Sequence, residues 1–179
     1  KRGYFTDFKI LDTKLHRPQI MDDNIIRQKI IDKLELNVVQ PLSLISAGAG
    51  FGKSNLVSEW LEQTAYPNTW ISLDNELNDF RAFLFYLIAA VEKIFPQTMA
   101  HSNNLIKAVE FPPFNVIFTS IINDICNIEE DFILILDDFH LIKEKQVHQF
   151  FNEWFRFPPT NVHLSIITRK DPPLDYKLL

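Results

Sequence analysis

The chain has few of the features that mark secreted, membrane-spanning or nucleic-acid-binding proteins. Its 179 residues include a single cysteine, Cys126, so an internal disulfide is excluded. They contain no signal-peptide pattern and no apolar run long enough to cross a bilayer. The formal net charge is -5 without a cluster of Lys or Arg, which argues against direct binding to DNA phosphates. We therefore expect a cytoplasmic protein without a membrane partner, in which any DNA binding belongs to a domain outside this chain.

Glycine is also scarce, and three of the four glycines fall within five residues. They follow the apolar segment 42–45, and apolar residues at helical spacing begin directly after them. The segment matches the phosphate-loop (Walker A) pattern, with Ala in place of the usual first glycine, as Ala47-Gly48-Ala49-Gly50-Phe51-Gly52-Lys53-Ser54.

This loop has the chemistry to hold the phosphates of a nucleotide. Glycines allow successive backbone amides to point at phosphate oxygens, and the following helix adds its N-terminal dipole. We expect Lys53 to reach the β- and γ-phosphates and Ser54 to bind Mg²⁺. An ordinary glycine-rich turn is the alternative, which the strand-turn-helix context disfavours. The expected cofactors are ATP or ADP with Mg²⁺, and the expected contacts are Ala47, Gly48, Ala49, Gly50, Phe51, Gly52, Lys53, Ser54 and Asn55.

Strand-like and helix-like segments alternate along the chain and predict an α/β fold. Apolar runs predict strands at 42–46, 69–73, 132–136 and 163–168. Amphipathic spacing predicts helices at 25–36, 53–66, 80–95, 114–128 and 147–155, with Asp79 as an N-cap. The pattern is typical of a P-loop NTPase, a doubly wound, mostly parallel sheet with helices on both faces. We assign residues 1–24 to an N-terminal extension and 25–179 to the nucleotide-binding domain.

Two carboxylates and an arginine follow predicted strands, at the sheet edge where ligands bind in such folds. Asp137 comes directly after an apolar strand, where a Walker B carboxylate contacts Mg²⁺. Asp138 could orient or deprotonate the attacking water, or alternatively cap the next turn. Arg169 could contact the γ-phosphate, or alternatively be a solvated arginine. The candidate catalytic residues are therefore Lys53, Asp138 and Arg169.

Other residues with possible chemistry have a simpler interpretation. His140 lies two residues after the Asp pair, but no second His or Cys is spaced to share a metal with it. We expect it to pack or to form a hydrogen bond. The aromatic stripes at 80–95 and 147–157, together with Trp60 and Trp70, are expected to be core.

The chain resembles the nucleotide-binding domain of the large LuxR-type, ATP-dependent transcriptional activators typified by the maltose-regulon activator (MalT-like proteins), within the STAND class of ATPases. Similar blocks lie in the same order at 13–18, 26–27, 46–54, 70–74, 136–142 and 168–174. The resemblance implies a resting form held by ADP, self-association with inducer and ATP, and slow hydrolysis that resets the switch. It also implies that Ile26 and Arg27 border the adenine. Winged-helix, sensor-repeat and DNA-binding helix-turn-helix domains are expected beyond residue 179.

Three classes of function remain open from the sequence. The resemblance implies a regulatory ATP/ADP switch with weak Mg²⁺-dependent ATPase activity, whose partners are nucleotide and its own C-terminal domains. A small-molecule phosphotransferase shares the loop, although only Arg156 and Arg169 follow the Asp pair, too few for an arginine-rich lid. The third class is an interaction module that has kept the fold without using nucleotide.

Overall fold

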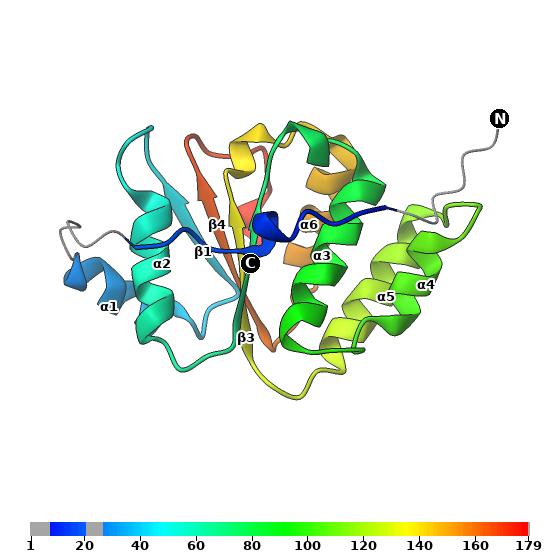
Figure 1. Ribbon diagram of the computed structural model, residues 1–179, viewed down its shortest axis with the longest axis horizontal. Helices are drawn as coiled ribbons and strands as arrows, with labels where there is room; N and C mark the ends of the chain where they lie inside the picture. Colours follow the sequence, from blue (N-terminus) through cyan, green and yellow to red (C-terminus); the bar gives the residue numbers. More distant parts are fainter. Residues whose placement is uncertain (1–7, 21–26, 179) are drawn as a thin grey trace.

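The computed structural model describes residues 8–20 and 27–178, which form a parallel β-sheet between two layers of helices (Figure 1). The strands are β1 (Leu42–Ser46), β2 (Asn68–Ser72), β3 (Phe132–Asp137) and β4 (Val162–Thr168). Their order across the sheet is β1-β4-β3-β2, and each neighbouring pair is parallel. Because parallel strands end at the same edge, the loops that follow β1, β3 and β4 lie close together.

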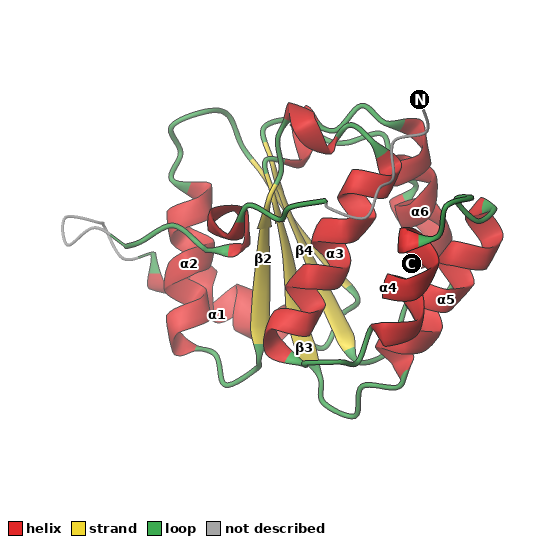
Figure 2. Ribbon diagram, turned by 45° about the vertical axis from the view of Figure 1, so that its right-hand side comes forward, coloured by secondary structure: helices red, strands yellow, loops and turns green. Residues whose placement is uncertain are grey.

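Helices cover both faces of this sheet. They are α1 (Gln28–Asn37), α2 (Lys53–Gln63), α3 (Phe80–Ile94), α4 (Ala100–Lys107), α5 (Phe114–Cys126) and α6 (Lys145–Arg156). Figure 2 shows α1 and α2 on one side of the strands and α3 to α6 on the other. The predicted three-layer, doubly wound α/β fold is confirmed. No helix within the described ranges combines the length and apolarity that a bilayer crossing requires.

Each face of the sheet has its own hydrophobic core because side chains alternate along the strands. Ile133 and Ile135 of β3 belong to the smaller core, which also contains residues of α1 and α2. Leu134 and Leu136 belong to the larger core, with residues of α3, α5 and α6. Every residue of β3 is buried, which confirms that its apolar run is a strand covered on both faces.

Most aromatic residues predicted to be core are buried, but Phe95 at the end of α3 is half-buried and another exception lies just after α6. Trp60 and Trp70 lie in the smaller core. Phe83 of α3 and Phe151 of α6 meet edge to face in the larger core, with ring centroids 5.8 Å apart. Phe157 follows α6 and is 67% exposed. The larger core therefore includes the inward faces of α3 and α6, together with residues of α5, β3 and β4.

The ends of several elements differ slightly from the prediction. Asp79 is the N-cap of α3, as expected, because its carboxylate accepts the Ala82 N–H at 2.8 Å. β2 covers 68–72 rather than 69–73. α1 begins at Gln28, and positions 25–26 of the predicted helix lie outside the described residues. No sequence pattern predicts α4.

Residues 8–20, which we call the N-terminal strap, cross over the edge strand β2 and pass from the side of α3 to that of α2 (Figures 1 and 2). Lys14 of the strap is buried, and its Nζ lies 2.7 Å from Asp74 Oδ2 and 2.7 Å from Glu76 Oε2. Leu15 joins the larger core. The strap therefore covers part of the sheet edge that β2 forms, which would otherwise be open to solvent. The domain boundary at residue 24 stays a prediction.

Candidate functional site

The phosphate-loop segment forms the turn from β1 into α2, at the carboxyl edge of the sheet. Gly50 and Gly52 have φ angles of 79° and 65°, a region that residues with a Cβ rarely adopt. A Cβ added to Gly50 would meet nothing within 4 Å, so the backbone angle rather than space requires glycine. Gly52 directly precedes α2, and the free amides of the first helical turn therefore face the loop.

Lys53 and Phe51 both contact Gly48 within the loop. Lys53 Nζ donates a hydrogen bond to the Gly48 carbonyl at 2.8 Å. The Phe51 ring lies 3.4 Å from the position that a Cβ on Gly48 would take. A phosphate oxygen would offer Lys53 a charged acceptor in place of this neutral carbonyl, and charge-assisted bonds are the stronger ones. The ammonium group of Lys53 therefore already lies beside the loop in which it is expected to bind phosphate.

Ser54 and Asp137, the two expected Mg²⁺ ligands, lie side by side although 83 residues separate them. Ser54 Oγ donates to Asp137 Oδ1 at 3.0 Å, and the Asp138 backbone N–H donates to the same oxygen at 2.9 Å. Asp137 is 6% exposed at the end of β3. Burial raises the pKa of Asp137 to about 6, the Ser54 bond opposes this shift, and the Asp138 charge adds to it. A nearby cation would favour the ionised carboxylate.

Asp138 has an unusual backbone conformation and does not cap the turn that follows it. Its φ of 57° is unusual for a residue other than glycine. It precedes the 3-10 turn Phe139–Leu141 and makes no side-chain cap bond to it, so the capping alternative is not realised. Its Oδ1 lies 3.9 Å from Arg169 Nε and 3.7 Å from His140 Nδ1. The carboxylate of Asp138 therefore lies near a guanidinium and an imidazole without a hydrogen bond to either.

The loop, Asp138 and Arg169 line one cleft of about 210 Å³. Its lining residues are Ala49, Gly50, Gly52, Lys53, Ser54, Asn55, Asp138 and Arg169. Asp137 reaches this cleft through its bond to Ser54. The prediction that the loop, the Asp pair and Arg169 meet at one edge of the sheet agrees with this geometry. Their roles in binding and catalysis stay predictions.

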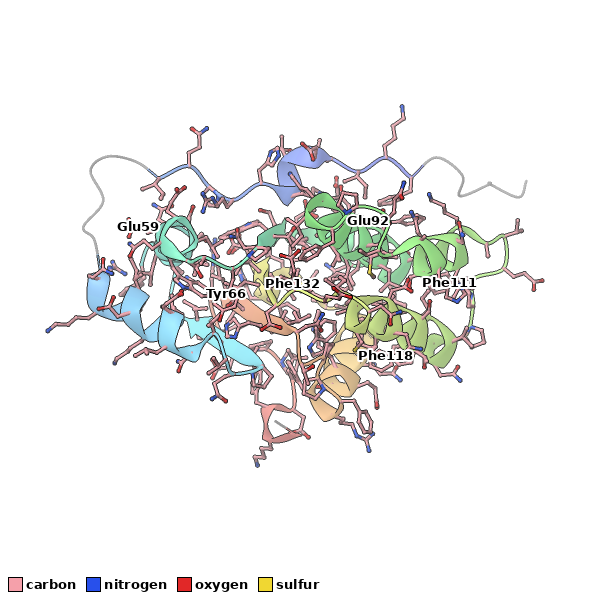
Figure 3. All side chains as sticks on the ribbon, turned by 90° about the horizontal axis from the view of Figure 1, so that it is seen from below. Glu59, Tyr66, Glu92, Phe111, Phe118 and Phe132 are labelled. Carbon is pink, nitrogen blue, oxygen red and sulfur yellow. The ribbon has the colours of Figure 1, made fainter. Side chains whose placement is uncertain are left out.

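A larger cavity of about 400 Å³ lies at the opposite edge, where the strands begin. Tyr66, Phe132 and His163 contribute to its lining. Figure 3 looks at this end of the molecule and labels Tyr66 and Phe132. None of the predicted site residues that the structure describes lines this cavity. A site chosen by cavity volume alone would thus miss the loop, Asp138 and Arg169, which line the smaller cleft.

Arg27 reaches the phosphate loop from the segment before α1. Its Nη1 donates to the Phe51 carbonyl at 2.8 Å, a contact between residues 24 positions apart. Ile26, the other residue expected beside the adenine, lies outside the described residues. The sequence gives no sign of the Arg27–Phe51 contact, because no motif joins the two positions. The adenine assignment of Arg27 stays a prediction.

His140 lies deeper in the site than the sequence indicates. Its side chain is 11% exposed, and its Nδ1 is buried without a hydrogen-bond partner among the described residues. Burial lowers the pKa of His140, with the charges of Arg169 and Lys53 adding to this and Asp138 opposing it. This shift favours the neutral form of the ring. Its position two residues after the Asp pair was the one available signal of this proximity.

No protein-family model matches the chain. Among curated proteins, the chain is similar to the HTH-type transcriptional regulator MalT. It is 27% identical to the Vibrio cholerae protein and 28% identical to the Yersinia pestis protein, over 165 residues and 92% of this chain in each case. The chain spans 18% of the length of these relatives. The resemblance to MalT-like regulators is thus confirmed. A Walker-type ATPase of Pyrococcus abyssi has a TM-score of 0.48 and 17% identity, over 85% of this chain and 47% of that one.

Proposed function

We propose that this chain is the ATP- and ADP-binding switch domain of a LuxR-type transcriptional regulator, with slow Mg²⁺-dependent ATPase activity. The observation that carries the proposal is the meeting of three groups in one cleft. These are the glycine loop with Lys53, the Ser54–Asp137 pair, and the Asp138–Arg169 contact. The similarity to proteins named as transcriptional regulators supports the regulatory role.

The residues of the cleft fit nucleotide phosphates together with a divalent cation. The Ser54 hydroxyl and the Asp137 carboxylate are hard oxygen ligands of the kind that Mg²⁺ prefers, and they would hold it. When bound, the ion neutralises charge on the β- and γ-phosphates. Lys53 and the amides of 47–55 would hold the phosphate oxygens themselves. Ile26 and Arg27 complete the proposed nucleotide contacts.

Asp138 is the proposed group that orients or deprotonates the attacking water. Its carboxylate lines the cleft beside Arg169 and is not used for capping, which leaves it placed to accept a proton from a water in the cleft. Arg169 would stabilise charge on the γ-phosphate, because its guanidinium lines the same cleft. Because few side chains would stabilise the transition state of hydrolysis, we expect ATP turnover to be slow. Slow hydrolysis suits a regulatory switch, since the ATP-bound form then has a long lifetime.

The other parts of the proposed switch lie in further domains of the same protein. The chain corresponds to 18% of its MalT relatives, which leaves room for inducer-sensing and DNA-binding domains. The net charge of -5 supports DNA contact through another domain rather than through this one. We propose that the ATP-bound form self-associates and that the protein works in the cytoplasm.

Hydrolysis and binding of Mg-ATP by Asp138→Asn test this proposal. Asparagine keeps the size of the side chain but is no base, so we expect kcat to fall about a hundredfold. Affinity for Mg-ATP, measured by calorimetry, should change less than the turnover rate. Asp131→Asn is a matched control, because Asp131 is exposed at the opposite end of β3. Full turnover by Asp138→Asn would exclude Asp138 from the role, and a wild-type chain that binds no Mg-ATP would end the proposal.

A further inference from the structure

The guanidinium of Arg27 lies over the part of the phosphate loop formed by Phe51 and Gly52. Besides the 2.8 Å bond from Nη1 to the Phe51 carbonyl, Nη2 would lie 4.0 Å from a Cβ built on Gly52. Phe51 in turn places its ring beside Gly48, at 3.4 Å from a Cβ built there. Because a charged donor makes a stronger hydrogen bond than a neutral one, Arg27 restrains this stretch of the loop.

Arg27 is itself held by a helix that packs firmly on α2. It is the N-cap residue of α1. Ile31 and Leu34 of α1 enter the smaller core beside Trp60 of α2. Trp60 Nε1 also donates to Glu35 Oε2 of α1 at 2.7 Å. Since α2 begins directly after the loop, α1 and the loop are supported by the same helix, and Arg27 bridges them at its start.

We infer that Arg27 is a positioning residue of the phosphate cradle, which holds the loop amides in place by binding the Phe51 carbonyl. This inference rests on the proposed function and assigns Arg27 to the phosphate end of the site rather than to the adenine. Arg27 then affects the binding of any diphosphate or triphosphate, whether or not a nucleoside is attached. An adenine contact would matter for nucleotides alone, whereas loop positioning matters for inorganic pyrophosphate as well.

Calorimetric titration of the full chain with Mg-ADP and with Mg-pyrophosphate separates these two roles. We expect Arg27→Ala to weaken both ligands by the same factor, about tenfold, as for the loss of one charge-assisted hydrogen bond. Arg17→Ala is the matched control, because Arg17 Nη1 also donates to a carbonyl of α2, that of Ser58 at 3.3 Å. Its affinities should equal those of the wild type, since Ser58 lies further along α2 than the loop.

A second measurement separates loop positioning from a direct contact between Arg27 and phosphate. In protein without ligand, amide hydrogen exchange over 48–54 should be faster in Arg27→Ala than in the wild type or in Arg17→Ala. A residue that acts only by touching the ligand would leave this exchange unchanged. The same measurement serves as a control for folding. Amides outside 48–54 should exchange at the wild-type rate if Arg27→Ala keeps the fold.

Two results would overturn the inference while leaving the proposed function intact. One is a loss of Mg-ADP affinity without loss of pyrophosphate affinity, which would place Arg27 at the nucleoside. The other is unchanged loop exchange in the ligand-free Arg27→Ala protein. A wild-type chain that binds neither ligand would instead refute the proposed function, and the inference with it.

Discussion

The side chain of Asp137 is buried, although its proposed role as a ligand of Mg²⁺ requires the ionised carboxylate. It accepts hydrogen bonds from the Ser54 hydroxyl and the Asp138 amide, yet burial raises its pKa to about 6. Two donors and Lys53 nearby do not outweigh the loss of water around the carboxylate. A cation beside Asp137 would supply the missing stabilisation, which is why the raised pKa supports the proposed metal-binding role.

Stability as a function of pH tests this view of Asp137. Its pKa rises from 3.8 to about 6 on folding, so folding favours the protonated form. The resulting stabilisation is complete below pH 3.8 and is lost as the pH rises through about 6. In Asp137→Asn this loss should disappear, and the free energy of unfolding at pH 8 should exceed that of the wild type by about 1–3 kcal/mol. Urea unfolding of both proteins at low and high pH, with a chelator present, measures these free energies.

The control for this experiment is again Asp131→Asn, which exchanges an exposed carboxylate at the other end of the strand. It should keep the wild-type dependence on pH. If Asp137→Asn shows that dependence as well, Asp137 does not titrate as described.

Residues within motifs could be predicted from the sequence, and contacts between motifs could not. Lys53, Ser54 and Asp137 were identified because glycine spacing and a buried strand set their chemical surroundings locally. The Arg27–Phe51 bond, between residues 24 positions apart, depends on how the segment before α1 folds against the loop. Such contacts leave no periodic signal in the sequence.

At the scale of elements, apolar pattern predicted every strand and failed for one helix. α4 has only Ser102 and Ile106 buried, so it shows no apolar stripe. Polar contacts with α5 help to hold it instead. The Ser102 N–H donates to Asp124 Oδ2 at 2.9 Å, and the hydroxyls of Ser102 and Ser120 lie 2.9 Å apart. A helix that is secured by such a buried polar network is invisible to a hydrophobic pattern.

The N-cap of α3 gives a prediction that concerns this element alone. Asp79 accepts the Ala82 N–H at 2.8 Å and so satisfies one free amide of the first turn. Asp79→Ala should lower the free energy of unfolding by about 1 kcal/mol, measured by urea denaturation. Asp79→Asn retains an acceptor and should stay within a few tenths of the wild type. Equal losses in both variants would show that the cap bond is not what stabilises α3.

At the scale of the whole molecule, the parallel sheet brings the site together. β4 lies between β1 and β3, so the loops after these three strands carry Lys53, Asp138 and Arg169 to one edge. The alternation of strands and helices predicts that they share this edge. It does not predict the strand order, because order depends on pairing between segments far apart in the chain.

The N-terminal strap provides a test of how the sheet edge is protected. Lys14 bridges Asp74 and Glu76 and lies 5.4 Å from the centroid of the Tyr86 ring. Burial lowers the pKa of Lys14, but the bonds to the two carboxylates outweigh this and raise it overall. Lys14→Met keeps the apolar stem but loses the ion pairs, and should reduce the free energy of unfolding by about 1–2 kcal/mol.

Glu76→Gln is the comparison for Lys14→Met, because Glu76 is 83% exposed and its pair should contribute less. Urea denaturation measures stability, and limited proteolysis reports whether the strap detaches. A Lys14→Met protein with wild-type stability and protease resistance would show that apolar packing alone holds the strap.

The central claim is that the loop from Gly48 to Ser54 binds the phosphates of a nucleotide, and calorimetric titration with Mg-ADP tests it most directly. The wild-type chain should bind one Mg-ADP, and Lys53→Ala should bind it at least about tenfold more weakly at an unchanged unfolding midpoint. Lys33→Ala, which alters an exposed lysine of α1, should bind as the wild type does. Equal affinity in wild type and Lys53→Ala, or no binding by the wild type, would contradict the claim.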